Sequence, residues 1–311
     1  MNHVHAWFRG ICLAATAVAV LGVPVPARGE PLVTATPPQP LGKGSVVVLR
    51  QAAAAHETQP AAHDPQAGEP GDLLIHFHGA VDTVRQAMER AGTNSTVVVV
   101  NQPGLSATYS TPFREDPGLF TRLLAEPLRD TSDDAPAIPP RWRRVTLSCF
   151  SAGYGAVREI LKTEDGFTRV DAIVAADSIY AGIDELATKT GDRQVDARDM
   201  AAFLAFAEQA ADGRKVFVIS HSSQPTPYAS TTETADYLLG RLGLERTPLE
   251  PRPGEEFSRV SHARRGCFEV EGFTGASGPA HLFHLRSLDR WWKSAEMLST
   301  PAGESRSRHV E

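Results

Sequence analysis

Short apolar runs alternate with longer amphipathic stretches along most of this chain. The apolar runs are rich in valine, isoleucine and leucine and cover residues 45–49, 73–77, 96–100, 145–149, 172–176, 216–219 and 267–273. Runs of this length and composition are typical of strands buried on both faces of a sheet. Between them, helical spacing of apolar positions predicts helices over residues 81–91, 116–128, 154–162, 198–211, 232–242 and 280–297. The alternation predicts an α/β fold with a doubly wound, mostly parallel sheet flanked by helices.

The amino-terminal end departs from this pattern. Residues 1–27 contain a basic residue, Arg9, then an apolar stretch over residues 11–25 that closes on small residues. This order is typical of a secretory signal peptide, and the apolar stretch is short for a membrane span. We expect cleavage between Ala27 and Arg28 and a secreted or periplasmic protein. A retained amino-terminal anchor is the alternative.

The remaining chain reads as one domain with a tether and a tail. Residues 28–43 are rich in proline, threonine and glycine and predict a linker, and residues 299–311 predict a flexible carboxyl-terminal tail. The domain itself is expected over residues 44–298, with loops at 52–70 and 130–142. Since no other segment approaches about 18 apolar residues, no membrane span is expected in the mature chain.

Charge and cysteine content limit the partners. The 311 residues carry a formal net charge of −6 without a basic stripe, so a nucleic acid partner is not expected. Cys149 and Cys267 remain once the leader is removed. We interpret both as small buried residues rather than as a disulfide. The sequence leaves the oligomeric state open.

The segment from Cys149 to Gly153 carries the clearest chemical signal. It joins the apolar run at 145–149 to the predicted helix at 154–162, with Ser151 at its centre. A serine between small residues at such a junction is typical of a nucleophile elbow, a tight turn that projects the hydroxyl from the edge of the sheet. The usual first glycine of this motif is Cys149 here, whose side chain is also small.

Other polar residues follow neighbouring apolar runs. His78, Gly79 and Ala80 come after the run at 73–77, Asp177 after the run at 172–176, and His281 near the start of the last predicted helix. In open parallel sheets, ligands bind outside the carboxyl ends of the strands. A serine, a carboxylate and a histidine therefore occur in that chain order near one expected site.

With these motifs the chain resembles the α/β-hydrolase superfamily over about residues 44–297. The elbow, the His-Gly loop after the second strand and the order serine, acid, histidine all match that superfamily. The resemblance implies Ser151 as nucleophile, His281 as general base and Asp177 as the acid that orients the base. It implies an oxyanion hole formed by the N–H of Ala152 and that of Gly79 or Ala80.

The implied function is that of a secreted serine hydrolase. It would cleave an ester, or an amide, through a covalent acyl-enzyme on Ser151, with a small molecule or a peptide as substrate. The implied mechanism needs no cofactor and no metal.

Several assignments stay open at this stage. Asp184, Glu233 and Asp236 are alternatives for the acid, and His284 is an alternative for the base. The expected pocket includes His78, Tyr180, His221 and His284, with irregular loops at residues 101–113 and 224–232.

Two other function classes compete with the hydrolase. One is a non-catalytic binding domain of the same fold, which the cysteine in the elbow keeps open. The other is a metal-dependent hydrolase that uses His76 and His78, since histidines at i and i+2 of a strand share one face. Hydrogen bonding that holds the oxyanion loop is the alternative role for these two histidines.

Overall fold

The computed structural model describes residues 33–51, 71–128, 141–184 and 193–299. The chain divides into two units, Met1–Pro31 and Leu32–Glu311, and the first lies outside the described residues. The expected signal peptide at 1–27, the loop at 52–70, most of the insertion at 130–142 and all but the first residue of the tail at 299–311 also lie outside them, so these expectations stay predictions.

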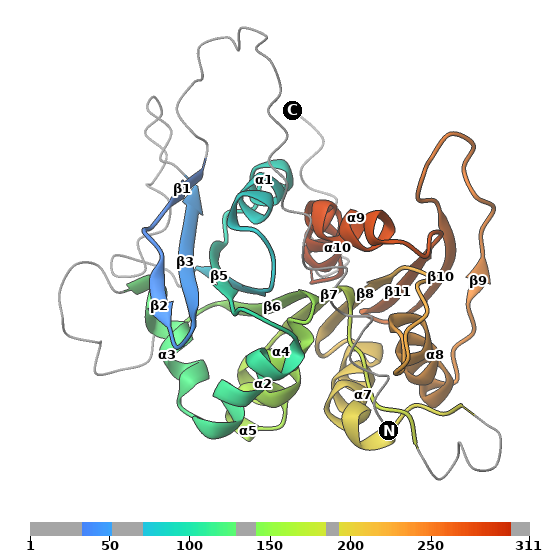
Figure 1. The fold of residues 1–311 in the computed structure, drawn as a ribbon, viewed down its shortest axis with the longest axis horizontal. Coiled ribbons are helices and arrows are strands. Elements are labelled where there is room, and N and C mark those ends of the chain that lie inside the picture. The colour runs from blue at the N-terminus through green and yellow to red at the C-terminus, as the bar shows by residue number, and fades with distance from the viewer. Residues whose placement is uncertain (1–32, 52–70, 129–140, 185–192, 300–311) are drawn as a thin grey trace, which may run out of the picture. The chain divides into compact units, whose positions relative to one another are not determined.

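An 11-stranded sheet runs through the second unit (Figure 1). Its strands are β1 (Val33–Ala35), β2 (Gln39–Leu41), β3 (Gly44–Gln51), β4 (Asp72–Phe77), β5 (Thr96–Asn101), β6 (Arg144–Ser151), β7 (Ala172–Ser178), β8 (Val216–His221), β9 (Thr247–Pro248), β10 (Arg259–Arg265) and β11 (Phe268–Phe273).

The strands follow the spatial order β1-β3-β5-β4-β6-β7-β8-β11-β10-β9, and β2 pairs with β3. From β5 through β11 all neighbours in this order are parallel. The strands at the two ends of the sheet pair antiparallel. The predicted mostly parallel sheet is therefore confirmed.

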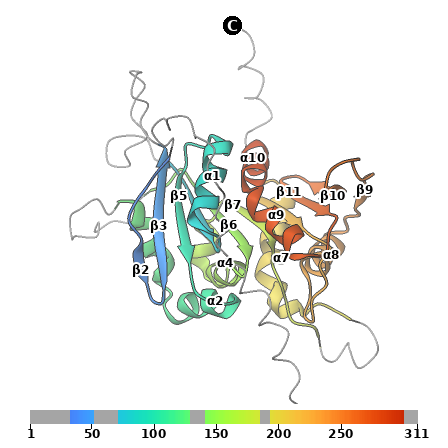
Figure 2. The same cartoon turned by 45° about the horizontal axis from the view of Figure 1, so that its top comes forward.

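Helices cover both faces of the sheet, as Figures 1 and 2 show. They are α1 (Val81–Ala91), α2 (Ser106–Glu115), α3 (Leu119–Ala125), the 3-10 turn η2 (Glu126–Leu128), α4 (Tyr154–Leu161), α5 (Glu164–Arg169), α7 (Ala197–Ala211), α8 (Thr231–Leu242), α9 (Gly278–Arg286) and α10 (Leu288–Ser299). One hydrophobic core joins the sheet to α2, α3, α4, α7 and α8, and a second joins it to α1, α9 and α10.

The central strands contribute alternate side chains to these two cores. In β7, Ile173 and Ala175 belong to the first core, whereas Val174 and Ala176 belong to the second. A strand with both faces covered needs apolar residues at every position, because neither set of side chains reaches water. This is the physical reason that the strands appear in the sequence as continuous apolar runs.

The structure corrects the prediction between β5 and β6. Residues 101–113 were expected as an irregular loop, yet α2 begins at Ser106 and includes Pro112 within its last turn. The single helix expected over 116–128 is α3 followed by η2. Proline, serine and threonine favour turns in isolation. Here the buried side chains of Tyr109 and Phe113 anchor the helix to the first core.

The ends of the domain also differ from the prediction. Part of the expected linker at 28–43 forms β1 and β2, which pair with β3. The hairpin of β9 and β10 was not predicted, because β10 lies toward the edge and is rich in arginine rather than apolar. The last helix is interrupted at Ser287, which caps α9 before α10 begins.

The cysteines and the helix lengths can also be compared with the predictions. Cys149 and Cys267 are both free thiols, as expected, with Cys149 buried and Cys267 only partly so. Within the described residues, no helix combines the length and apolarity needed to cross a bilayer.

Candidate active site

The carboxyl ends of β4, β6 and β7 lie next to one another in the sheet and carry the candidate residues. Ser151 ends β6, His78 directly follows β4, and Asp177 occupies the next-to-last position of β7. Because β4 and β7 are the two neighbours of β6, all three residues come to one edge of the sheet. This is the edge at which ligands bind in open parallel sheets.

The turn after Ser151 is as tight as the sequence predicts. Ser151 has a φ of 47°, and α4 begins three residues later at Tyr154. A Cβ at Gly153 would lie 2.2 Å from the backbone oxygen of Phe77, and one at Gly155 would lie 2.4 Å from the backbone oxygen of Ser106. Larger residues at these two positions would therefore push α4 away from β4 and α2.

Positive φ angles cluster at this edge. Among the described residues, the non-glycine positions with positive φ are His78 at 72°, Ser151 at 47°, Asp177 at 41° and Ile179 at 74°. Such conformations are strained for residues with a side chain and concentrate at functional sites. Three of the four were predicted as site residues from the sequence.

Asp177 is a buried carboxylate with three hydrogen-bond donors. One oxygen, Oδ1, accepts from the Ser222 N–H at 2.9 Å and from Thr231 Oγ1 at 2.6 Å. The other, Oδ2, lies 2.7 Å from His281 Nδ1. Burial alone would raise the pKa of this carboxyl, but the His281 hydrogen bond, the nearby charges of His284 and His281 and the Thr231 hydrogen bond lower it below its usual range. Asp177 is therefore ionised at neutral pH.

A local irregularity between β6 and β7 gives Asp177 its position. Phe150 pairs with Ala176, but Ser151 pairs with Ser178, so Asp177 is an extra residue on β7. The Ser178 hydroxyl donates to the Ser151 carbonyl at 2.8 Å and holds the two strand ends together. A bulge of this kind re-aims a side chain next to an active site.

His281 lies in the first turn of α9. Ser277 caps this helix through the Ala280 N–H. The imidazole packs on the Phe150 ring, with 4.4 Å between ring centroids, and its Nδ1 contacts Asp177. Within the described residues, Ser151 Oγ and His281 Nε2 form no hydrogen bond. Such contacts are often long in an unliganded enzyme and tighten when the substrate binds.

The loop after β4 presents one free backbone donor. The Gly79 N–H donates to Asn101 Oδ1 at 3.0 Å, and the Asn101 side-chain amide donates back to the Gly79 carbonyl at 2.8 Å. The prediction of Gly79 as a possible oxyanion donor is thus corrected, because its N–H already donates to Asn101. In the described part of the chain, no partner accepts from the N–H of Ala80 or of Ala152. From the sequence, Asn101 was expected only as part of a pocket loop.

His76 holds this loop in place through contacts of both its ring nitrogens. Its Nδ1 lies 2.9 Å from Ser148 Oγ and its Nε2 lies 3.2 Å from the His78 carbonyl. Trp292 donates to the same Ser148 hydroxyl at 3.0 Å. Burial lowers the pKa of His76 to about 3, so the ring is neutral. Both ring nitrogens of His76 are engaged, which favours the hydrogen-bonding role over metal binding.

His78 contacts a tyrosine through one of its ring nitrogens. Its Nδ1 lies 2.8 Å from the hydroxyl of Tyr109. No group of three or more histidine, cysteine, aspartate or glutamate side chains with metal-binding geometry occurs in the parts of the chain that the structure describes.

Two of the histidines expected in the pocket are buried beneath the site. His284 contacts Ser220 Oγ through Nδ1 at 2.9 Å, and its exposed fraction is 0%. His221 contacts the Ser222 carbonyl at 3.0 Å and Thr232 Oγ1 at 3.1 Å. The prediction that His221 and His284 line the pocket is therefore corrected. Because its side chain is fully buried and its Nδ1 contacts a hydroxyl rather than a carboxylate, His284 is also a poor alternative for the base.

Tyr180 belongs to an aromatic cluster near the acid. Its ring lies 5.6 Å from that of Tyr154 and 5.4 Å from that of Tyr228, centroid to centroid. Tyr154 begins the helix after the elbow, and Tyr228 comes from the loop after β8. Tyr180 and Tyr228 are partly exposed, so this cluster can contribute a wall of a substrate pocket.

The alternative acids have other partners. Glu233 caps α8 at Ser230 and pairs with Arg193 at 2.6 Å. Asp236 pairs with Arg246 at 2.7 Å. Asp184 lies beyond the end of β7, where its N–H donates to the Gln194 carbonyl at 2.9 Å. Of the acids considered, Asp177 is the one that contacts the predicted base.

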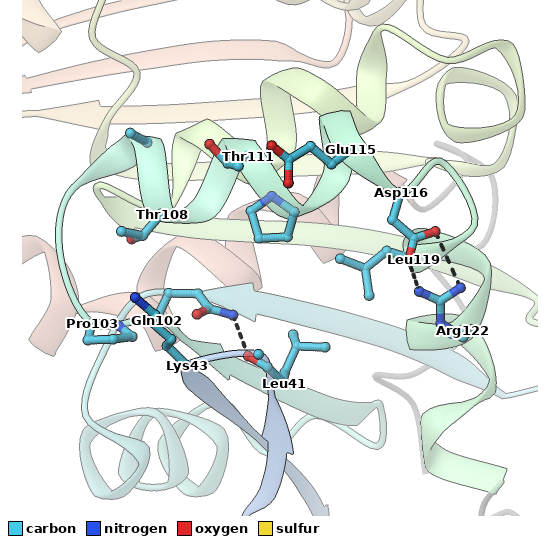
Figure 3. A pocket seen from close by; sticks show the side chains of 13 residues that line it. Leu41, Lys43, Gln102, Pro103, Thr108, Thr111, Glu115, Asp116, Leu119 and Arg122 are labelled. Carbon is cyan, nitrogen blue, oxygen red and sulfur yellow. Dashed lines mark hydrogen bonds and ion pairs between the residues drawn. The ribbon is translucent and has the colours of Figure 1, made fainter.

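A pocket of about 600 Å³ lies between the turn that joins β2 to β3 and the helices α2 and α3 (Figure 3). Its lining is mostly apolar and includes Leu41 from the end of β2 and Pro112 from α2. The Gln102 side chain donates to the Leu41 carbonyl at 3.0 Å and joins the two walls. None of the three predicted catalytic residues lines this pocket, although part of the expected loop at 101–113 does.

The order and direction of the strands, with helices on both faces, are those of the α/β-hydrolase fold. The predicted fold class is therefore confirmed. No family model and no curated protein matches the sequence.

Solved structures of similar fold include three enzymes. A cold-adapted esterase from an Arctic intertidal metagenomic library is 9% identical, with 85% of this chain and 96% of that chain covered and a TM-score of 0.42. A carboxylesterase from Bacillus subtilis is 10% identical, with 86% and 90% covered and a TM-score of 0.37. A haloalkane dehalogenase loop variant from Bradyrhizobium elkanii is 11% identical, with 86% and 99% covered and a TM-score of 0.42.

Proposed function

We propose that this protein is a serine hydrolase that cleaves an ester bond by acyl transfer to water. The observation that carries the proposal is the 2.7 Å contact between Asp177 and His281 at the same sheet edge as Ser151. A buried carboxylate bound to Nδ1 leaves Nε2 of the imidazole as the proton acceptor. A serine needs such a base to become a nucleophile.

The proposed reaction proceeds in two balanced steps. Ser151 Oγ attacks the ester carbonyl while its proton moves to His281, which then protonates the departing alcohol. Water next attacks the acyl-enzyme and gives a proton to His281, and His281 returns that proton to Ser151 Oγ as the carboxylic acid product leaves. Asp177 stays ionised and stabilises the protonated imidazole. The N–H groups of Ala80 and Ala152 donate hydrogen bonds to the carbonyl oxygen as it becomes negative.

The test is Ser151→Ala in the purified protein. Removing the nucleophile of a triad lowers turnover by roughly a million-fold in comparable enzymes. The fold should persist, with a change in stability within about 1 kcal/mol. Ser95→Ala is the matched control, because Ser95 lies before β5, at the opposite edge of the sheet. It should keep full activity.

Labelling by a fluorophosphonate probe separates the hydrolase from its alternatives. The wild type should react with the probe and turn over ester substrates, whereas Ser151→Ala should do neither. Turnover that survives Ser151→Ala and stops with a chelator would support the metal-dependent alternative. A wild type that neither labels nor cleaves any ester or amide would support the non-catalytic binding domain.

Export of the protein is part of the same proposal. The order of a basic residue, an apolar stretch and small residues in 1–27 supports a cleaved signal peptide. Amino-terminal sequencing of the exported protein should give a sequence that begins at Arg28. A sequence that begins at Met1 would contradict cleavage.

A further inference from the structure

The side chain of His78 packs against two aromatic rings near the candidate active site. It directly follows β4 with a φ of 72° and is partly exposed. Its ring stacks on that of Phe150 at a 15° angle, with 5.9 Å between centroids, and meets Tyr109 edge-on at 5.4 Å. Phe150 also contacts His281. The His78 ring is therefore held in one orientation, against the same Phe150 ring that the proposed catalytic base contacts.

The hydrogen bonds of Tyr109 determine which nitrogen of His78 carries the proton. The Tyr109 hydroxyl oxygen accepts from the Gln102 N–H at 2.9 Å. The single phenolic proton can go to His78 Nδ1 at 2.8 Å or to the Gln102 carbonyl at 3.2 Å. We assign it to the shorter contact. His78 Nδ1 is then an acceptor, and Nε2 carries the hydrogen.

The resulting donor is neutral and unused. Burial, with a smaller contribution from the charge of His281, lowers the pKa of His78 to about 4. A neutral ring does not oppose the positive charge that His281 gains during the reaction. In the described part of the chain, His78 Nε2 has no hydrogen-bond partner, and it is not among the fully buried polar atoms that lack one.

We propose that the Nε2–H of His78 donates a hydrogen bond to the carbonyl oxygen of the bound ester. The bond strengthens as that oxygen becomes negative, so His78 adds a side-chain donor to the backbone donors of Ala80 and Ala152. Its place supports this role, because His78 belongs to the same loop as Ala80 and packs on the residue that precedes Ser151. The inference rests on the proposed ester hydrolysis.

The decisive variant is His78→Phe, which keeps an aromatic ring against Phe150 and removes both nitrogens. Loss of one oxyanion donor lowers kcat by roughly 100- to 1,000-fold in comparable enzymes, and we expect a loss in that range with KM changed less than about threefold. His78→Gln places an amide N–H near the position of Nε2 and should recover most of kcat. Affinity for a trifluoromethyl ketone, which forms a tetrahedral oxyanion on Ser151, should fall by the same factor as kcat/KM.

Two further measurements distinguish donation from a structural role. The acid limb of the kcat/KM profile reports the base and should keep its midpoint in His78→Phe. In a ¹⁵N-histidine NMR spectrum, His78 should show the Nε2–H tautomer, and Tyr109→Phe should weaken that preference. A shifted acid limb, or equal losses in His78→Phe and His78→Gln, would mean that His78 acts through packing and would overturn the proposal.

The outcome is separable from that of the proposed function. If His78→Phe keeps the wild-type kcat while Ser151→Ala is inactive, the hydrolase stands and the role of His78 is wrong. If the wild type itself neither labels nor turns over esters, the proposed function fails and this inference fails with it.

Discussion

Acidification should destabilise this protein well before its carboxylates titrate. His76, His221 and His284 are buried, with exposed fractions of 0%, 4% and 0%. Burial is the largest cause that lowers their pKa values, to about 3, 4 and 3. A histidine whose pKa is lower in the folded state binds its proton in the unfolded state first. The associated stability is complete above about pH 6.5 and is lost as the pH falls toward 4.

The size of the effect follows from these values. Between pH 7 and pH 5, an unfolded histidine with a pKa near 6.5 takes up a proton that the buried one does not, which costs about 2 kcal/mol of stability. Three such residues cost about 6 kcal/mol together. This is a large part of the roughly 5–15 kcal/mol that stabilises an ordinary domain. We therefore expect unfolding, and with it loss of activity, in mildly acidic solution.

The assay is urea unfolding of the full chain at a series of pH values. His284→Phe removes one titrating group from a site already lined by Phe273, Phe283 and Trp291. Its unfolding free energy should fall by about 2 kcal/mol less than that of the wild type between pH 7 and pH 5. Packing costs cancel in this comparison because they are the same at both pH values.

Leu285→Ala is the matched control on the same helix. Leu285 is buried, so this variant should lose about 2–5 kcal/mol at every pH without a change in slope. If His284→Phe shows the wild-type pH dependence, His284 is not held neutral by burial, and the reasoning is refuted.

Four other variants, one of them a control, test the site. Asp177→Asn should lower ester turnover by roughly 10,000-fold, because Asp177 contacts the proposed base. Asp236→Asn should keep the wild-type turnover, because Asp236 pairs with Arg246 instead. Equal losses in the two variants would show that Asp177 is not the catalytic acid. Gly153→Ala should lower the melting temperature and the activity together, since its Cβ would lie 2.2 Å from a backbone oxygen of β4; an unchanged melting temperature would contradict this packing. Asn101→Ala should lower kcat by roughly tenfold or more by freeing the Gly79 loop, and unchanged kinetics would show that the loop holds its shape without Asn101.

The sequence predicted those parts of the fold that depend on local pattern. The central strands were predicted because burial on both faces requires continuous apolar runs, and α1 was predicted to the residue. Helix α2 was missed because its proline, serines and threonines favour a loop until Tyr109 and Phe113 are buried. The β9 and β10 hairpin was missed because its polar edge carries no periodic apolar signal.

The site was predictable where the chemistry needs a particular residue type. Ser151, Asp177 and His281 lie at strand ends or just beyond them, which a sequence pattern can locate. The supporting hydrogen bonds were not predictable. Asn101 contacts the Gly79 loop and Thr231 contacts Asp177, each from a segment far away in the chain, so only the fold brings them there.

The strained residues at the strand ends imply a trade-off between durability and activity. Each non-glycine residue with positive φ costs about 1–3 kcal/mol, so the four of them weaken the domain by an amount comparable with its net stability. Selection for a more robust chain would replace Ser151 or His78 with glycine first, since glycine adopts these angles freely. The same replacements would remove the proposed nucleophile and the proposed additional donor. Thermostabilising substitutions should therefore be sought away from the carboxyl ends of the strands. A substitution that relieves the strain there would also remove a residue that the proposed activity needs.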